Sequence, residues 1–508
     1  MKAFLTALIV ALWIFAFAVP RASIKLFWAD ESNAIYQTCP GSFSEMIKFG
    51  AYSQSSPNPF YYFLEKPLAT SVKGVGENLM LQYRWIAIFS AVLTALFLCY
   101  QIGNWLGLYV SLLGITSLIG REIFQQFGAE NRPYMLWVLL FYLFTYFASR
   151  FTAEGPARFS AKRIGLLSLV GLPLVMVSSS SFLQLGAGFF GVITFWLWNQ
   201  SWTQLAPWKR KTFIVTGIVL FVIGYYYAVL TAKLIAPGGH FINVGAYDLK
   251  ETHNYRHIAS VLSLLISRDG FHDWILNLFF LAGLTFPFLK HPRFSQIKAE
   301  QKIKIQSLAW HLWLQIAVSV VIGGLVYHYH YHFVQRVFIQ LIIIRALAIV
   351  IGGIYFAELL KNFLSQRQSL SYFRPIAGVF IVILGISDYT YQHKSLTIFK
   401  ESYRLTRQRA QELRPCLDFE GVVKLMIPAG GSEHQFLNMS VELGYDIARC
   451  GRKSDQGETY ILASGVFEPD PIGNFKREHV LFQKSPVPLL GPAYQPVTQC
   501  GWKVVSRP

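Results

Sequence analysis

An adjacent pair of carboxylates, Asp30 and Glu31, lies directly after the first apolar run of the chain, 4–19. Acidic side chains at the point where a chain leaves a membrane cost free energy unless they are solvated or paired, so they indicate a function. A carboxylate in such a place can act as a general base that takes a proton from a hydroxyl group. Asp30 is therefore the first candidate for a catalytic residue, with Glu31 as its companion.

Cations that could complete this chemistry occur at Arg84, Arg132 and Arg336, each close to an end of an apolar run. The guanidinium group presents a planar fork of N–H donors that matches phosphate oxygens, whereas Lys66 could meet a phosphate as a point charge. A base together with phosphate ligands would suit transfer of a sugar from a lipid-phosphate carrier. The base would activate the acceptor hydroxyl, and the cations would hold the phosphate leaving group.

The composition restricts the class of protein. The 508 residues are 53% apolar, 16% aromatic and only 14% charged, and their mean hydropathy is +0.39. These values argue against a soluble enzyme and predict a polytopic membrane protein. The formal charge of +18 would indicate nucleic acid in a soluble protein, but here much of the Lys and Arg falls in short loops. We attribute this charge to membrane topology and to attraction to anionic membrane lipids, and we expect no nucleic-acid partner.

Apolar runs of about the length needed to cross a bilayer predict about eleven transmembrane helices, of which the third is the weakest. We therefore expect an all-α polytopic membrane protein with a small C-terminal α/β domain. The first helix is interpreted as an uncleaved span. The predicted spans are 3–19, 84–102, 105–120, 133–150, 164–181, 183–199, 213–231, 273–289, 308–327, 338–360 and 375–391.

The charge of the loops predicts the orientation. By the positive-inside rule the basic loops are cytoplasmic, and so is the N-terminus. The loop 20–83, the loop 232–272 and the tail 392–508 then face outwards, on the same side as Asp30. The basic residues that set this orientation lie at 150–163, 209–211, 290–304 and 361–374.

Two domains are predicted, a transmembrane domain at 1–391 that includes the outer loop 20–83 and an extracytoplasmic α/β domain at 392–508. In the tail, the patterns at 422–427 and 459–462 predict strands, and 433–448 has the apolar spacing of a helix. A disulfide among the outward cysteines is plausible in an oxidising compartment, but the pairing stays open. These cysteines are Cys39, Cys416, Cys450 and Cys500, whereas Cys99 falls inside a span.

Motifs spread over residues 1–390 follow one pattern. The first two motifs are the Asp-Glu pair after the first span and an aromatic segment that begins Pro-Phe-Tyr-Tyr at Pro59. The third is Arg84, at the entry to the second span. The last two are the stretch Gln-Gln-Phe-Gly-Ala-Glu-Asn-Arg-Pro-Tyr, which ends at Tyr134, and Arg336 before a late span. This pattern resembles the GT-C membrane glycosyltransferases, in particular the branch of protein O-mannosyltransferases and bacterial polyprenyl-phosphate-sugar transferases. Their features are an outer Asp-Glu pair, a His-Pro-Pro-Leu-Tyr-Tyr segment and a Gln-Glu-Ala-Arg-Pro-Tyr signature.

The resemblance implies an inverting enzyme of the bacterial inner membrane that moves a sugar from a polyprenyl-phosphate carrier to a glycan, lipid or protein acceptor. Its active site would lie on the extracytoplasmic face, and its C-terminal domain in the periplasm. Asp30 would be the general base with Glu31 beside it. The donor phosphate would be bound by Arg84, Arg132, Arg336 and Lys66. The resemblance implies further substrate contacts for Glu130, Tyr134, Tyr61 and Tyr62.

Some positions depart from the family's pattern. Pro57 and Asn58 stand where the family has His and Pro, a serine run at 178–181 stands where many members carry His, and Asn131 is an insertion in the Glu-Ala-Arg register. Because of these departures, the sequence leaves open whether the protein requires a divalent metal, and no cofactor is assigned. The alternating Tyr/His run at 327–332 has two histidines at metal-binding spacing but no third ligand, so an aromatic segment at the interface is favoured there and no metal site is predicted.

The same residues also have interpretations without catalysis. Asp30 and Glu31 would suit the N-terminus of an interfacial helix that begins at Ser32, because acidic residues favour helix N-termini. The arginines would suit interfacial anchors that extend to lipid headgroups, and the tyrosines would suit an aromatic belt.

Two other functional classes stay open. A secondary transporter would be expected to show paired half-repeats or broken helices around a midplane site, and no convincing repeat is visible in the sequence. A lipid-linked oligosaccharide ligase or polymerase would be expected to depend on a large late outer loop with basic and His residues, whereas the acidic pair here is early. A structural or assembly role would leave the Asp-Glu pair without an explanation.

Overall fold

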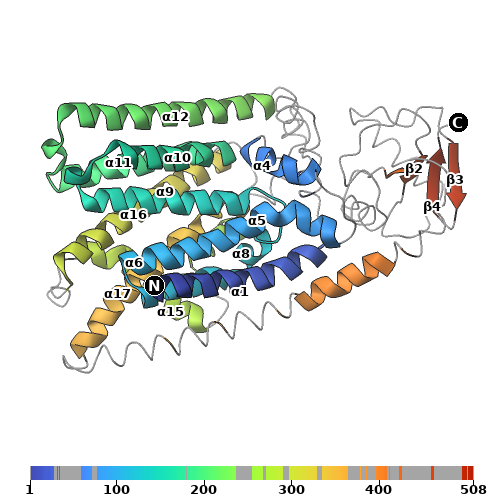
Figure 1. Cartoon of the computed structure of the whole chain (residues 1–508), viewed down its shortest axis with the longest axis horizontal. Helices are drawn as coiled ribbons and strands as arrows, with labels where there is room; N and C mark the ends of the chain where they lie inside the picture. Colours follow the sequence, from blue (N-terminus) through green and yellow to red (C-terminus); the bar gives the residue numbers. More distant parts are fainter. Residues whose placement is uncertain are drawn as a thin grey trace. The chain divides into compact units, whose positions relative to one another are not determined.

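A computed structural model shows long helices, many of them side by side, and a small sheet near the C-terminus (Figure 1). It also describes single residues at Glu31, Ala34, Gly378, Gly385, His393 and Gln411. The continuous segments that it describes are 2–27, 59–70, 77–178, 180–235, 255–266, 271–289, 297–328, 335–363, 396–408, 423–425, 459–462, 495–499 and 502–506.

Seven described helices are long and apolar enough to cross a membrane. Together with the composition, they confirm the predicted multi-pass helical membrane protein. The α5 helix continues without a break through a π-helical turn, η1 (Leu98–Ile102), into α6 (Gly103–Trp105). The seven helices are α1 (Lys2–Ile24), α5 (Glu77–Phe97) with its continuation, α9 (Tyr134–Glu154), α11 (Ser181–Trp198), α12 (Pro207–Ile235), α16 (Ala299–His328) and α17 (Leu341–Phe363).

Three further helices coincide with predicted spans but are shorter. The weak third span is α7 (Leu108–Ile119), the fifth is α10 (Ala161–Val177), and the eighth is α15 (Phe271–Thr285) with η5 (Phe286–Phe288). The eleventh predicted span, 375–391, falls almost wholly outside the described residues. The count of eleven therefore stays a prediction.

Short elements connect these helices. Gly107, between α6 and α7, has a φ of 133°, a backbone conformation that favours glycine, and it lets the chain turn sharply there. The short helices are α4 (Pro59–Thr70), α8 (Glu122–Phe127), η2 (Pro156–Arg158), η3 (Trp202–Gln204), α14 (Tyr255–Leu262) and η7 (Gln335–Phe338).

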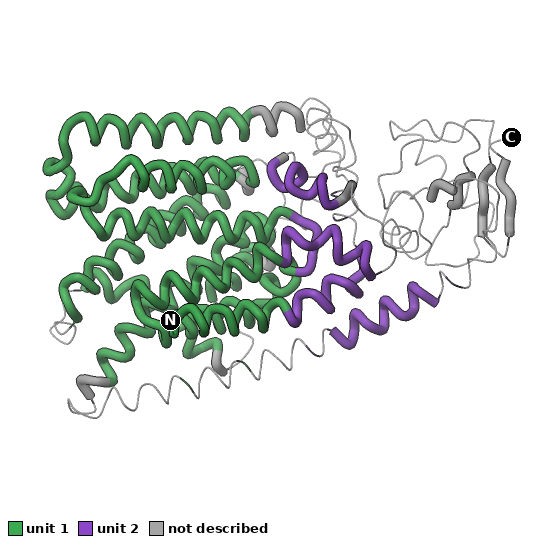
Figure 2. The backbone as a smooth tube through the Cα atoms, viewed as in Figure 1, with its two compact units in different colours: residues 1–15, 89–128, 133–391 green, residues 16–88, 129–132, 392–508 purple. Residues whose placement is uncertain are grey.

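The chain forms two compact units, drawn in different colours in Figure 2. Unit 1 comprises 1–15, 89–128 and 133–391 and contains most of the long helices. Unit 2 comprises 16–88, 129–132 and 392–508. The second unit therefore includes the outer loop, the tail and residues 130–132, which we call the Glu-Asn-Arg junction. The two domains predicted at 1–391 and 392–508 remain a prediction.

The packing of unit 1 separates central helices from peripheral ones. In α9 and α17, 78% and 83% of the apolar window is buried, against 17% in α12. Side chains such as Leu169 and Val320 are apolar and more than two-thirds exposed, as expected for helices that face acyl chains rather than water. The side-by-side arrangement of α9, α10, α11 and α12 is visible in Figure 1.

The helices α15 and α17 pack with unusually close backbones. A Cβ atom at Gly283 would collide with the carbonyl of Ala348, and one at Gly352 would collide with the carbonyl of Phe279. Small residues allow such close approach between membrane helices. Beside this contact, Arg345 of α17 is buried and donates to Asp273 at 3.4 Å and to Asn277 at 3.2 Å, both on α15.

The core of unit 2 lies between the end of α1 and the start of α5. Ile24 and Phe27 pack against Leu79, Met80 and Tyr83, and the helical segment 396–408 adds apolar side chains to the same cluster. This cluster fixes the beginning of the outer loop against the first turns of α5.

The described strands form one mixed sheet in the order β1-β2-β4-β3. The strands β1 (Val423–Leu425) and β2 (Thr459–Leu462) match two predicted strands and pair in parallel. The strands β3 (Gln495–Gln499) and β4 (Trp502–Ser506) were not predicted and form an antiparallel pair at the C-terminus. The predicted helix 433–448 and the outward cysteines lie outside the described residues, so the α/β domain as a whole stays a prediction.

Candidate active site

Glu31 and Arg84 form a buried ion pair in unit 2. Nε and Nη2 of Arg84 donate to Oε1 and Oε2 of Glu31 at 2.9 Å each, and neither side chain is exposed to solvent. This bidentate arrangement fixes the plane of both groups. Breaking a buried pair of this kind by removing one partner typically costs about 3–5 kcal/mol, because the remaining charge stays buried without compensation.

Arg84 is also fixed by backbone and aromatic contacts. Its Nη1 donates to the carbonyls of Ala22 at 2.6 Å and Lys25 at 2.5 Å, and its guanidinium lies 4.5 Å from the centre of the Phe27 ring. Four of its five N–H groups are therefore used. The end of α1 and the start of the outer loop are thereby tied to the second turn of α5.

The Glu-Asn-Arg junction meets the same carboxylate. The backbone N–H of Asn131 donates to Oε1 of Glu31 at 2.6 Å. The neighbouring Glu130 forms an ion pair with Lys25, and both side chains are almost fully buried. Burial lowers the pKa of Lys25, and the negative charge of Glu130 opposes that shift. Residues about 100 positions apart in the chain thus meet around Glu31.

The helix α4 adds a third side to this cluster. The Tyr61 hydroxyl donates to Oδ1 of Asn131 at 2.8 Å, and Tyr61 and Tyr62 are both fully buried. Glu65 is also fully buried. Its pKa is raised well above the ordinary value because burial disfavours the charged form; Glu31 adds to the shift, while Asn131 and Arg132 oppose it.

The burial of the two tyrosines bears on one of the alternatives. Side chains of an aromatic belt face lipid headgroups, whereas Tyr61 and Tyr62 have no exposed surface and pack against each other with ring centres 5.4 Å apart. They are therefore internal residues of unit 2, and the belt interpretation is wrong for them.

The remaining predicted site residues fall in several places. Arg132 is buried beside Asn131, and Lys66 is half-buried on α4. Tyr134 and Arg336 belong to unit 1, where Tyr134 packs on Phe127 with ring centres 4.6 Å apart. Asp30 lies outside the described residues, immediately before Glu31.

Three residues of the cluster were missed as candidates by the sequence analysis. Asn131 lies inside a predicted motif, and Lys25 and Glu65 lie near predicted motifs, but their roles depend on partners far along the chain. The available signal was a charged residue in an apolar setting, since such residues are rarely left unpaired at a membrane interface.

No group of three metal-ligating side chains occurs among the described residues. The tyrosine and histidine run ends outside them, because residues 329–334 are not described. Within the described part of the chain, the cluster around Glu31 is held by ion pairs and hydrogen bonds. A divalent metal remains open, as in the sequence analysis.

Two crystal structures of ArnT from Cupriavidus metallidurans are similar to this chain along nearly its whole length. The structure bound to undecaprenyl phosphate has 13% sequence identity and a TM-score of 0.48, and the alignment covers 99% of this chain and 98% of that one. The apo structure has 13% identity and a TM-score of 0.44, with coverage of 99% and 97%. No family model and no curated protein sequence matches the chain. At this level of identity and score, the likeness does not by itself place the chain in a family.

Proposed function

We propose that this protein is a GT-C-type membrane glycosyltransferase that moves a sugar from a polyprenyl-phosphate carrier to an extracytoplasmic glycan, lipid or protein. The proposal rests on the motifs that resemble that family and on the cluster that unites them. Asp30 is the general base, and the reaction inverts the anomeric centre.

The observation that carries the proposal is the double anchoring of Glu31. Its carboxylate is held by Arg84 from α5 and by the backbone N–H of Asn131. Glu31 of the motif after the first span and the junction 130–132 therefore meet within unit 2. The base is assigned to Asp30, the residue immediately before Glu31 in the sequence.

The chemistry follows from the roles of the groups. The Asp30 carboxylate takes the proton of the acceptor hydroxyl while that oxygen attacks the anomeric carbon. The bond between the anomeric carbon and the phosphate oxygen breaks, and polyprenyl phosphate leaves with the electron pair. A positioned base of this kind typically contributes about 10²–10⁴-fold to the rate.

The charge of the cluster supports an anionic substrate. Its cations are Lys25, Arg84 and Arg132, and its carboxylates Glu31 and Glu130 are each in an ion pair. Burial raises the pKa of the further carboxyl group, that of Glu65. The cluster thus brings three cations into a buried setting, and cations in such a setting suit a phosphate leaving group.

Within this proposal the cations have different tasks. Arg84 acts as a positioning residue, because most of its donors already hold Glu31 and the end of α1. Contact with the donor phosphate is assigned to Arg132, with Lys66 and Arg336 as further ligands. Glu130 and Tyr134 are assigned to substrate contacts.

A transporter is the second candidate, and one observation favours it. Arg345 and Asp273 form a buried charged pair between membrane helices α17 and α15, and intramembrane charges often line solute pathways. Arg345 also bonds to Asn277 and Ser117, however, and such a network equally suits a structural role.

The test compares lipid-linked sugars and surface glycans by mass spectrometry in cells with and without this protein. The proposal expects one polyprenyl-phosphate sugar to accumulate in the deletion strain and one glycan modification to disappear. Unchanged lipid-linked sugars and glycans, with altered solute flux across the membrane, would overturn the glycosyltransferase in favour of the transporter.

A further inference from the structure

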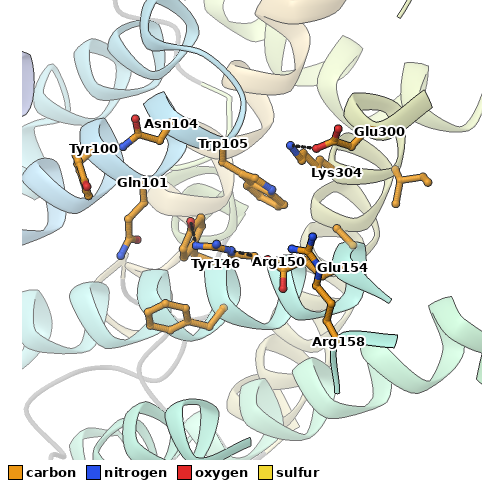
Figure 3. Close-up of a pocket in the computed structure, with 13 residues that line it drawn as sticks. Tyr100, Gln101, Asn104, Trp105, Tyr146, Arg150, Glu154, Arg158, Glu300 and Lys304 are labelled. Atoms are coloured by element: carbon orange, nitrogen blue, oxygen red, sulfur yellow. Dashed lines mark hydrogen bonds and ion pairs between the residues drawn. The ribbon is translucent and has the colours of Figure 1, made fainter. Parts of the chain in front are cut away.

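A cavity of about 740 Å³ lies in unit 1, and none of the residues assigned to the site above lines it. It is formed by the C-terminal end of the α5–η1–α6 segment, the last turns of α9, η2 and the first turns of α16. Figure 3 shows polar and aromatic side chains from all four segments around it. By the predicted topology, these helix ends lie on the cytoplasmic side.

The charges around the cavity are unequal. Glu154 is shared between Arg150, whose Nε lies 2.9 Å from its Oε1, and Arg163. The other carboxylate that lines the cavity, Glu300, is 2.7 Å from Nζ of Lys304. Arg158 lines the same cavity. The cavity is thus lined by three cations and two carboxylates, and both carboxylates are already paired.

The cations are accessible to a ligand. The side chain of Arg150 is 51% exposed, that of Lys304 is 27% exposed, and Arg158 is exposed. A guanidinium has five N–H donors, and Arg150 uses its Nε for Glu154 and its Nη1 for the hydroxyl of Tyr146. Arginine and lysine donors of this kind match the oxygens of a phosphate group.

The same cavity has an apolar wall that reaches the outside of the bundle. Tyr100 is 41% exposed and Ile303 is 45% exposed, although both lie on membrane helices. Trp105 and Tyr146 both line the cavity and pack edge to face, with ring centres 5.5 Å apart. Exposed apolar side chains on such helices face acyl chains, so the wall offers a path for a lipid tail beside the cations.

We propose that this cavity binds the phosphate group of an anionic phospholipid of the cytoplasmic leaflet. Arg158 and Lys304 contact the phosphate oxygens, and the acyl chains lie along Tyr100 and Ile303. Basic pockets between membrane helices on the cytoplasmic side are suited to anionic headgroups. The site is separate from the proposed sugar transfer and does not depend on it.

The experiment uses the purified full-length protein in detergent and counts bound lipid by native mass spectrometry. The probes are dioctanoyl phosphatidylglycerol, dioctanoylglycerol, which has the same chains without phosphate, and inorganic phosphate as a competitor. The variants are Arg158→Gln and Lys304→Gln. The matched control is Lys211→Gln, an exposed lysine near the predicted cytoplasmic end of α12 that does not line the cavity.

We expect phosphatidylglycerol to bind the wild-type protein with one dominant stoichiometry and dioctanoylglycerol not to bind. Each cavity variant should weaken binding about tenfold, since a charge-assisted hydrogen bond contributes about 1.5–3 kcal/mol, and Lys211→Gln should bind like the wild type. If inorganic phosphate competes as strongly as the lipid, the site is for a phosphate group from a soluble source. Absence of binding to the wild type, unchanged binding in both cavity variants, or an equal loss in Lys211→Gln would overturn the proposal.

Discussion

Arg84 shows at the scale of one residue how the site is organised. An arginine beside an acidic motif predicts a phosphate ligand, yet this side chain is enclosed between Glu31, two backbone carbonyls and the ring of Phe27. A group that is fully buried and mostly satisfied holds its neighbours in place. Its contribution to catalysis would therefore come through the position of Glu31.

Replacing Arg84 by Lys tests this positioning role. Lysine keeps the positive charge but lacks the planar fork, so the bidentate pair with Glu31 and at least one carbonyl bond are lost. Hydrogen bonds to charged groups contribute about 1.5–3 kcal/mol each, and we expect the melting temperature of the purified protein to fall by several degrees. Arg404→Lys is the control, because its pair with Glu401 is exposed and such pairs contribute little. Equal melting temperatures for both variants would contradict the account.

Glu65 gives a pH dependence whose sign follows from its environment. Burial raises the pKa of the Glu65 carboxyl group in the folded protein. At a pH between its pKa in the unfolded chain and its pKa in the folded protein, the carboxyl group is therefore protonated in the native state and ionised in the unfolded state. Stability from this group is complete below about pH 4 and falls as the pH rises towards the folded pKa.

We expect Glu65→Gln to melt higher than the wild type at pH 8, and the difference to shrink as the pH is lowered to 5. The comparison of the two proteins cancels the titration of all other groups. Glu77→Gln, at an exposed carboxylate of the same unit, should show no such trend. A difference that is constant across this pH range would refute the assignment.

Sequence reasoning reached part of this cluster. Glu31, Arg84, Glu130, Arg132 and the two tyrosines were identified through their resemblance to known motifs. Lys25 and Asn131 were not, because an ion pair or a hydrogen bond across about 100 residues leaves no mark in local composition. Glu65 was missed because its burial depends on the packing of the whole cluster. For the same reason, the use of Arg84 donors by backbone carbonyls could not be foreseen.

At the scale of elements, hydrophobic runs predicted the seven described helices that are long enough to cross a membrane, because burial in a bilayer needs a long apolar segment. Three shorter helices coincide with further predicted runs. The boundaries were less well predicted where polar residues continue a helix beyond the apolar run. The helix α5 begins at Glu77 rather than 84, and α16 begins at Ala299 rather than 308. The strands β3 and β4 were missed, and β3 contains Pro496, a residue that argues against a strand interior.

The contact between α15 and α17 leads to a prediction at this scale. Replacing Gly352 by Ala would place a methyl group against the backbone of Phe279 and force the helices apart. We expect a lower melting temperature and less folded protein after extraction. Gly324→Ala, on α16, meets nothing within 4 Å and should be neutral or stabilising, since alanine favours helix by up to about 1 kcal/mol. The same loss in both variants would show that the close packing is not the cause.

At the scale of the whole molecule, the proposed function requires Asp30 to face the extracytoplasmic side of the membrane. The basic loops predict a cytoplasmic N-terminus and an outward tail, which would place Asp30 and 392–508 on the same side. We expect alkaline phosphatase fused after Pro508 to be active in a bacterial host, and the same reporter inserted within 290–296 to be inactive. The reverse pattern would contradict an extracytoplasmic site.

The central claim is that Asp30 is the base for sugar transfer, and the most direct measurement is the transfer activity of Asp30→Asn. The variant would be produced in cells that lack the wild-type protein, and its amount and melting temperature would be matched to the wild type. The account predicts a rate at least about 100-fold lower, with accumulation of the same lipid-phosphate sugar as in the deletion strain. Wild-type transfer by the folded Asp30→Asn protein would contradict it.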